Sequence, residues 1–269
     1  MKRSSIVLPV FVLAASLPLC SLAAEETPAP AAAPEQQEPS ATPYRPTAAN
    51  PAELSAPGWL ELEAGGLRTK GGGPAWQNNT PWLAKLAFTE DFGVMVGGDF
   101  RVRRTDTEGA VMSGRGDTTL MFKHRFEAGE NAAFGLEWGT KFDSAATGIG
   151  SGKADYTATG IYSRDIGKLR IDANLGVTRL GLQEDGLARH QYPWAVAASH
   201  PVGEGWTLAL EASGVYRRGA PASTQLLAAA SYSVTKRLVL DVGVASRLAD
   251  AAPRWSAFVG ATYLAARFW

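Results

Sequence analysis

The chain has 269 residues, with 26 lysines and arginines against 26 aspartates and glutamates, 29 glycines, 16 prolines and one cysteine. A balanced charge without a basic block excludes a nucleic-acid-binding protein, which needs an excess of Lys and Arg on one face. The single long apolar run lies near the N-terminus, so a polytopic helical membrane protein, with about 20 apolar residues for each span, is excluded too. A membrane β-barrel remains compatible with this composition.

Residues 1–23 have the pattern of a secretory signal peptide. Two basic residues precede an apolar run from Ile6 to Leu19, and small residues follow it. The small residues predict cleavage after Ala23, which would remove the only cysteine, Cys20. Lipid modification of Cys20 is the less favoured alternative, because Leu19 stands where a small residue is needed. We therefore expect an exported chain without disulfide bonds.

Residues 24–57 contain 8 of the 16 prolines and only two sizeable apolar side chains, Tyr44 and Leu54. A segment of this composition buries too little surface to offset the entropy lost on ordering. It is predicted to be a disordered, Pro/Ala-rich periplasmic spacer. Use of the spacer as a tether to peptidoglycan or to a partner is an alternative that the sequence leaves open.

From residue 58 to residue 269, segments of about ten residues alternate apolar with polar or small side chains, and turn residues separate them. The clearest case opposes Val94, Val96, Phe100 and Val102 to Asp99, Arg101 and Arg103. The twelve predicted strands are residues 59–69, 82–90, 94–105, 117–127, 133–143, 155–166, 168–181, 192–202, 206–218, 224–234, 238–248 and 255–269.

The predicted connections alternate in length, with five short turns and six longer, Gly-rich loops. Outer-membrane barrels have this arrangement, with short periplasmic turns and long extracellular loops. A soluble β-sandwich is the competing fold, because its strands alternate as well. The even strand number, the strand length and aromatic residues near the strand ends favour the membrane. We predict an all-β protein: a transmembrane antiparallel β-barrel of about 12 strands over residues 58–269, in the bacterial outer membrane, with a disordered N-terminal segment.

The charged side chains share one face of the predicted strands, and we assign that face to the lumen. Nine are basic and eight acidic: Glu61, Glu63, Lys85, Asp99, Arg101, Arg103, Lys123, Arg125, Glu137, Lys141, Asp143, Arg170, Asp172, Glu211, Arg217, Asp241 and Arg247. Such balance allows either ion pairs that close the lumen or a wet channel whose charges select solutes. The sequence decides neither this, nor the solute, nor the oligomeric state.

Aromatic side chains near the strand ends are assigned to the two membrane interfaces. They are Trp59, Trp82, Tyr162, Tyr192, Trp194, Trp206, Tyr216, Tyr232, Trp255, Tyr263 and Trp269. The chain ends in Phe268-Trp269, which resembles the C-terminal signal of bacterial outer-membrane barrels. Which of these two residues occupies the signal position stays open.

Catalytic and metal-binding patterns are not found in the sequence. His124, His190 and His200 do not fall beside a serine that neighbouring strands would bring close, as a Ser-His pair requires. Metal ligands at usable spacing are absent, and residues 65–73 lack the order of a phosphate-binding loop. We expect a protein without catalytic activity, cofactor or bound metal.

Residues 116–123, GDTTLMFK, resemble the GD-x-x-L-x-x-K strand of the outer-membrane transporter family labelled for the MetA pathway of phenol degradation. Residues 165–181, 240–243 and 259–263 resemble later strands of the same family, so that the similarity extends over residues 114–269. The resemblance implies a 12-stranded barrel that takes up small compounds, aromatic or hydrophobic ones among them. Asp117 and Lys123 carry over as positions of the pattern, without an assigned role.

These observations lead us to expect a passive outer-membrane channel. Its expected partners are the lipid bilayer of the outer membrane, the machinery that assembles outer-membrane barrels, and a small-molecule solute. The alternative is a structural or adhesive barrel whose lumen is plugged by ion pairs and which transports nothing.

Overall fold

The computed structural model describes residues 38–249 and 251–269. The predicted signal peptide, residues 1–23, and the first part of the predicted spacer, residues 24–37, lie outside the described residues. No helix within the described ranges is long and apolar enough to cross a membrane. The strands are β1 (Trp59–Lys70), β2 (Trp76–Ala87), β3 (Phe92–Thr105), β4 (Val111–Gly114), β5 (Thr118–Glu127), β6 (Ala132–Lys141), β7 (Asp155–Ile166), β8 (Leu169–Arg179), β9 (His190–Pro201), β10 (Trp206–Arg217), β11 (Ser223–Thr235), β12 (Leu238–Arg247) and β13 (Trp255–Arg267).

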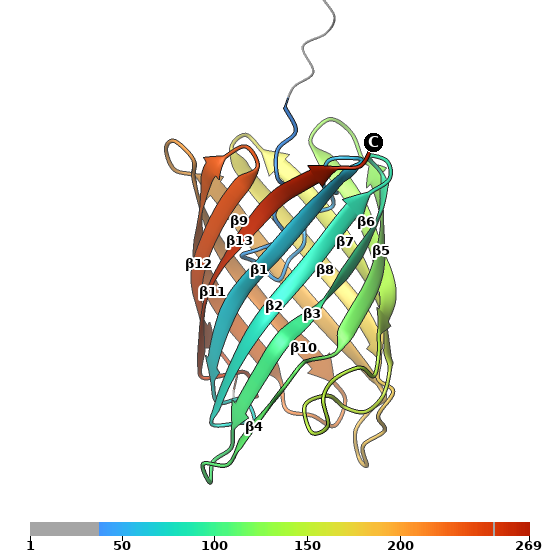
Figure 1. Cartoon of the computed structure of the whole chain (residues 1–269), viewed down its shortest axis with the longest axis vertical. Coiled ribbons are helices and arrows are strands. Elements are labelled where there is room, and N and C mark those ends of the chain that lie inside the picture. Colours follow the sequence, from blue (N-terminus) through green and yellow to red (C-terminus); the bar gives the residue numbers. More distant parts are fainter. Residues whose placement is uncertain (1–37, 250) are drawn as a thin grey trace, which may run out of the picture. The chain divides into compact units, whose positions relative to one another are not determined.

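The strands form a closed antiparallel barrel (Figure 1). The sheet closes because β1 pairs with both β2 and β13, and β2 pairs in turn with β3. The short β4 pairs with the end of β3 and extends that hairpin, while β5 continues the wall. The wall therefore has twelve strands, which confirms the predicted fold.

Short turns and long loops alternate along the chain, as predicted. The short turns and the C-terminus lie at one end of the barrel, at the top of Figure 1, and the long loops at the other. We call these the short-turn end and the long-loop end. The largest deviation from the predicted strands is β2, which begins at Trp76 rather than at residue 82. The polar residues 77–79 pair with β1 as regular strand residues, and their polarity on both faces had indicated a loop.

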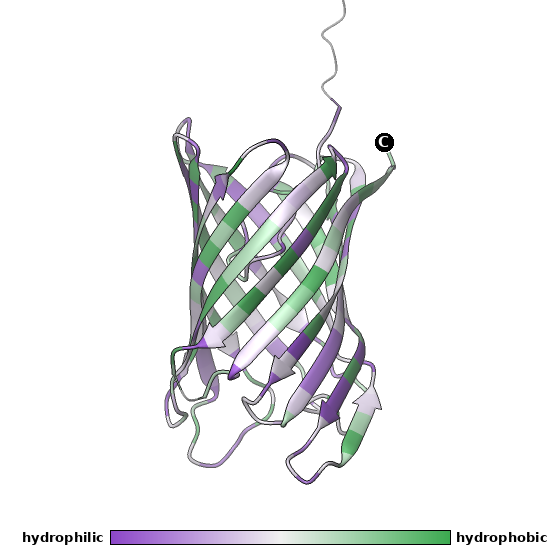
Figure 2. Ribbon diagram, turned by 90° about the vertical axis from the view of Figure 1, so that its left-hand side faces the viewer, coloured by the Kyte–Doolittle hydropathy of each residue, from purple (hydrophilic) through white to green (hydrophobic). Residues whose placement is uncertain are grey.

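Successive side chains of each strand point alternately into the lumen and outward. Leu210 is 66% exposed, whereas the adjacent Glu211 is 2% exposed. Glu211 lies on the lumenal face, where its carboxylate accepts a hydrogen bond from the N–H of Ala48. On β12, Val242 is exposed and Asp241 is buried in the same way. Figure 2 shows hydrophobic residues spread along the strands of the wall, with more hydrophilic colouring toward the long-loop end. An apolar outer face and a polar interior are typical of a barrel in a membrane.

Residues 38–57 enter the barrel at the short-turn end and run inside it before β1 begins, so the prediction of a flexible spacer does not hold for them (Figure 1). Near the short-turn end, the N–H of Ala41 donates to the carbonyl of Lys236 at 2.8 Å. Farther along, the segment donates hydrogen bonds to side chains of the wall, and Pro57 leads into β1. The composition of the segment predicted disorder, but the segment needs no apolar core of its own. The lumen supplies its hydrogen-bond partners.

Gly139 on β6 lies where a side chain has no room. A Cβ at this position would lie 2.0 Å from the carbonyl oxygen of Leu120 and 2.7 Å from the Sδ of Met121. We expect Gly139→Ala to lower the free energy of unfolding by about 1–3 kcal/mol, because the strand pairing must shift. Urea unfolding in detergent micelles measures this difference. Gly66→Ala is the matched control, since its Cβ meets no atom within 4 Å, and equal stabilities of the two variants would contradict the prediction.

Candidate functional site

The lumen contains a polar cluster formed by the barrel wall and by residues 41–53, which we call the lumenal segment. The segment makes hydrogen bonds or ion pairs to β1, β2, β5, β6, β7, β8, β10 and β12. Because these strands lie around the whole circumference, the segment crosses the lumen rather than following one wall. It lies in the half of the barrel nearer the short-turn end (Figure 1).

Tyr44 lies at the centre of this cluster and is 5% exposed. Two ammonium groups face its ring, with Lys85 Nζ 3.9 Å and Lys123 Nζ 4.1 Å from the ring centroid. Its hydroxyl accepts a hydrogen bond from Lys123 Nζ at 2.8 Å and donates one to the carbonyl of Glu53 at 3.0 Å. Burial, and after it the negative charge of Glu137, raises the pKa of Tyr44 well above its usual value. The hydroxyl therefore stays protonated, so that it can donate to Glu53 while it accepts from Lys123.

Lys85 on β2 neutralises two carboxylates of β1. Its Nζ lies 2.5 Å from an oxygen of Glu61 and 2.5 Å from an oxygen of Glu63, and all three side chains are buried. The same ammonium donates to the carbonyl of Thr42 in the lumenal segment at 2.6 Å. A buried charge must be paired and hydrogen-bonded to be tolerated. This lysine therefore holds the segment and the wall together.

Lys123 on β5 plays the corresponding part on the other side of Tyr44. Its Nζ lies 3.2 Å from Glu137 on β6 and donates to the carbonyl of Pro51. Glu137 in turn accepts hydrogen bonds from Asn50 Nδ2 at 3.1 and 3.0 Å. Two buried lysines thus clamp both ends of the lumenal segment.

Main-chain N–H groups of the lumenal segment also donate to inward side chains. This mode of binding satisfies buried carboxylates without a cation for each of them. The N–H groups of Thr42 and Tyr44 donate to Glu61 and Glu63 at 2.8 Å, those of Ala48 and Ala49 to Glu211 at 2.6 and 2.9 Å, and that of Ala52 to Ser163 Oγ at 2.8 Å.

Two arginine pairs complete the cluster. Arg45 donates through Nε and Nη2 to the two oxygens of Asp241 on β12, at 3.0 and 2.9 Å. A Cβ at Gly260 would lie 2.3 Å from this Nε, so glycine makes room for the guanidinium. On β8, Arg170 pairs with Glu53 of the segment and, at 3.2 Å, with Asp172. Bidentate pairs of this kind fix orientation as well as charge.

A cavity of about 320 Å³ lies in the lumen on the long-loop side of the segment. Ala48 and Asn50 of the segment form part of its lining, and Glu137, Asn174 and Gln225 contribute polar groups from the wall. The cavity has the size of a small-molecule pocket. The lumen thus combines a filled level near the short-turn end with a cavity beyond it.

The structure brings most of the residues assigned to the lumen together around the segment. These are Glu61, Glu63, Lys85, Lys123, Glu137, Arg170, Asp172, Glu211 and Asp241. Others lie apart from the cluster. Toward the long-loop end, Asp99 accepts a hydrogen bond from Asn79 at 2.8 Å, Lys141 pairs with Asp117 at 2.8 Å and Arg217 with Glu184 at 2.5 Å. Arg125 pairs with Asp91 at the short-turn end, and Asp143 and Arg247 are exposed near the long-loop end.

Arg101 and Arg103 lie on the outer face, so their assignment to the lumen was wrong. Between the pairs Asn79↔Val102 and Pro81↔Asp99, β3 has one residue more than β2, which is a β-bulge. A single extra residue reverses the faces of all side chains beyond it. Val102 is accordingly buried in the lumen, while Arg101 and Arg103 are exposed.

The outward direction follows from the register. Arg103 is opposite Asn78, Asn78 opposite Arg68, and Arg68 opposite Ala257. The same row continues to Val244, which is 58% exposed on the outer wall. The two arginines therefore share a face with the apolar exterior.

The aromatic residues assigned to the interfaces lie toward both ends of the wall. At the short-turn end, Trp206 packs against Tyr232 with the rings tilted by 40°, and Trp269 stacks against Phe88. Trp82 is an exception, because it lies in the middle of β2, opposite Ala64 and Gly98, where it stacks on Phe100 with ring centroids 5.2 Å apart. Trp59 and Tyr263 lie in the short-turn half, and Trp194 and Trp255 in the long-loop half. Both Phe268 and Trp269 are exposed, at 61% and 54%.

Asp117 fixes a long loop to the wall just before β5. Its carboxylate accepts hydrogen bonds from Lys141 Nζ and from the N–H groups of Ser144 and Ala145, at 2.8, 3.0 and 2.9 Å. Burial alone would raise the pKa of Asp117, but these hydrogen bonds outweigh it and lower the pKa below its usual value. Asp117, which matches the aspartate of the family pattern, thus has a structural role at the rim of the barrel.

Sequence reasoning missed the lumenal segment, including Tyr44, Arg45 and Asn50. One signal was available. The predicted inward residues near the short-turn end included more carboxylates than cations, and the unmatched carboxylates needed hydrogen-bond donors from elsewhere. In the described part of the chain, no group of three His, Cys, Asp or Glu side chains is arranged to hold a metal ion.

Several solved outer-membrane proteins have the same architecture. The COG4313 outer membrane channel from Pseudomonas putida F1 matches with a TM-score of 0.64 at 12% identity, over 79% of this chain and 97% of that one. The KdgM porin matches with a TM-score of 0.54 at 12% identity, over 76% and 98%. The CymD monoaromatic hydrocarbon channel matches with a TM-score of 0.52 at 8% identity, over 80% and 90%. At these identities the likeness establishes the fold, a porin-like outer-membrane β-barrel.

The sequence profile of the family described as "Putative MetA-pathway of phenol degradation" matches residues 58–268. The chain belongs to this family, which confirms the resemblance seen in residues 116–123. A comparison with curated protein sequences found no match.

Proposed function

We propose that the protein is a passive outer-membrane channel for small solutes, aromatic or hydrophobic ones among them, and that the lumenal segment sets the width of its passage. The observation that carries this proposal is the lumen itself. Its wall side chains are polar, and beyond the segment it holds a cavity of about 320 Å³ instead of a packed apolar core. A barrel of twelve strands is wide enough for such a passage.

The family and the fold support the same conclusion. The similar solved structures are named as channels and porins, and one of them is named as a channel for monoaromatic hydrocarbons. The outer wall is apolar between two levels of aromatic side chains, as a barrel in the outer membrane requires. In this orientation the short-turn end faces the periplasm and the long loops face the cell exterior.

A second candidate is a structural or adhesive barrel with a closed lumen. It is favoured by the cluster around Tyr44, where two buried lysines pair with three carboxylates of the wall and Arg170 pairs with Glu53 of the segment. In this case the long loops would carry the function. The two candidates differ in whether the full chain lets solutes pass.

Solute flux into proteoliposomes separates the two. We expect the full chain to admit benzoate and arabinose faster than protein-free vesicles do, and to exclude a trisaccharide, because the segment crosses the lumen. Vesicles with heat-denatured protein control for leakage. Flux of benzoate and arabinose no greater than in this control would favour the closed barrel, and faster entry of benzoate than arabinose would support an aromatic solute.

A further inference from the structure

Four cations lie close together on the outer wall near the long-loop end. They are Arg68 and Lys70 on β1 and Arg101 and Arg103 on β3, and we call them the basic patch. Arg68 and Arg103 are both opposite Asn78 of β2, so their side chains share one row across three strands. The β-bulge in β3 creates the patch, because without it the two arginines of that strand would point into the lumen.

The basic patch has no carboxylate partner within the described residues, where no Asp or Glu oxygen lies within 4.0 Å of its four cations. Arg101 donates to Ser113 Oγ at 3.1 Å, which leaves its charge uncompensated. This differs from the lumen, where Arg45, Lys85 and Lys123 are all ion-paired. Uncompensated cations on the outer wall of a barrel face lipid or its headgroups, where a charge without an anion is costly.

Aromatic side chains hold two of these cations in place. The guanidinium of Arg68 lies 4.4 Å, and the ammonium of Lys70 4.9 Å, from the centroid of the Trp76 ring. Trp76 packs edge-on against Trp255 with ring centroids 5.5 Å apart. Tryptophans of this kind mark the level of the lipid headgroups.

A polar hollow of about 510 Å³ lies between the cations, lined by Arg68, Trp76, Asn78, Thr80, Arg101 and Arg103 among others. It continues along the wall into an apolar hollow of about 460 Å³, which also includes Arg68 and Asn78 and which Gly66, Val242 and Val259 line from the outer face. Gly66 and Val259 are opposite each other and lie deeper along β1 and β13 than Arg68. The surface thus changes from basic to apolar in the direction of the membrane interior.

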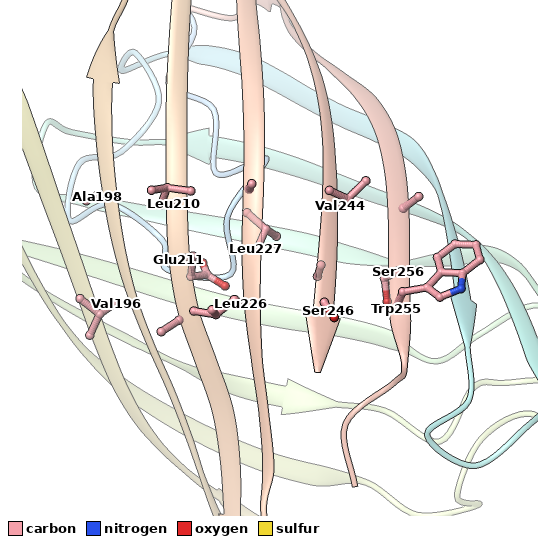
Figure 3. A pocket seen from close by; sticks show the side chains of 14 residues that line it. Val196, Ala198, Leu210, Glu211, Leu226, Leu227, Val244, Ser246, Trp255 and Ser256 are labelled. Carbon is pink, nitrogen blue, oxygen red and sulfur yellow. The ribbon is translucent and has the colours of Figure 1, made fainter. Parts of the chain in front are cut away.

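The apolar surface extends farther around the barrel. A third hollow, of about 770 Å³, shares Val244 and Ala257 with the second and spans β9 to β13 (Figure 3). Leu210, Leu226 and Val244 line it, and Trp255 lies at its edge beside the basic patch. Small residues such as Ala198, Ala212 and Ala228 form its floor.

We propose that the basic patch and the adjoining apolar hollows bind one lipid of the outer leaflet, a lipid with phosphate groups on its head and several acyl chains. The four cations match the phosphates in charge, and arginine binds phosphate oxygens in pairs. The apolar hollows receive the acyl chains. A free phosphate ion would bind to the basic patch alone, and a lipid without charge would bind to the apolar hollows alone.

Binding of fluorescently labelled diphosphoryl lipid A to the full chain in zwitterionic detergent micelles tests the proposal by fluorescence anisotropy. We expect the double variant Arg101→Gln/Arg103→Gln to bind about 20-fold more weakly than the wild type, since each cation near an anionic lipid surface contributes appreciably to affinity. Raising the salt concentration should weaken the wild type more than the double variant. Arg179→Gln is the matched control, because Arg179 is an exposed residue at the same end of the barrel, on β8.

Competing ligands distinguish the sources of the phosphate. Unlabelled diphosphoryl lipid A should displace the label, while dephosphorylated lipid A and inorganic phosphate should displace it at least about ten-fold less well. Equal competition by the dephosphorylated lipid, displacement by inorganic phosphate alone, or equal affinity of the wild type and the double variant would overturn the proposal. A change of mobility on heating shows on gels that each variant is folded, and Arg103→Gln alone serves if the double variant does not fold.

Discussion

Deletion of residues 38–53 is expected to raise the single-channel conductance of the barrel by about three-fold or more, because the deletion removes the chain that crosses the lumen. The segment contacts strands on all sides of the barrel, so its removal widens the passage over its whole cross-section at that level. Residues 54–57 stay in place to lead into β1. Planar bilayer recordings of the purified, refolded variants measure the effect.

The side chains of the wall remain charged after this deletion. Lys85 and Lys123 keep their carboxylate partners Glu61, Glu63 and Glu137, and water replaces the hydrogen bonds of the segment. We therefore expect the barrel to stay folded. The matched control replaces residues 38–53 by a Gly/Ser stretch of equal length, which keeps the chain but removes Tyr44 and Arg45. Conductance of the deletion variant equal to that of the full chain would show that the segment does not limit the passage.

Lys85→Met is expected to lower the free energy of unfolding by about 3–5 kcal/mol, because it leaves two buried carboxylates without their cation. The side chains of Glu61 and Glu63 are 0% and 3% exposed, and both lie 2.5 Å from the lysine. Methionine has nearly the volume of lysine, so loss of packing contributes little. Urea unfolding in detergent micelles gives the difference.

Two further variants separate charge from packing in this experiment. The triple variant Lys85→Met/Glu61→Gln/Glu63→Gln removes the uncompensated charges and should recover most of the lost stability. Arg125→Met breaks a half-exposed pair with Asp91 at the short-turn end and should cost no more than about 1 kcal/mol. A cost of Lys85→Met as small as that of Arg125→Met would show that the buried pairs carry little of the stability.

The barrel was predictable because its strands obey local rules. Alternation with period two on β12, turns such as Gly203 to Gly205 and the even number of strands are all visible in the sequence, and they fixed the fold class and the face of most residues. The polar start of β2 was not predicted, because Gln77 and Asn78 break the alternation of apolar and polar residues on which the prediction depends.

Two other features depend on contacts that no local pattern records. The bulge in β3 inserts one extra residue between Asp99 and Val102. Because of this shift of register, Arg101 and Arg103 point outward, whereas the sequence predicted that they point into the lumen. The order of residues 38–57 depends on carboxylates that lie far away in sequence, such as Glu211, 162 residues beyond Ala49. Polar partners at such separations cannot be recognised from the composition of the segment itself.

The partners of the lumenal segment also determine when it can bind. They come from β1 at the start of the barrel and from β12 near its end, so the binding site is complete once β13 has paired with β1. Contacts of such large sequence separation form late in folding. We therefore expect the segment to become ordered after the barrel has closed, so that protection of Tyr44 from solvent would report closure of the barrel.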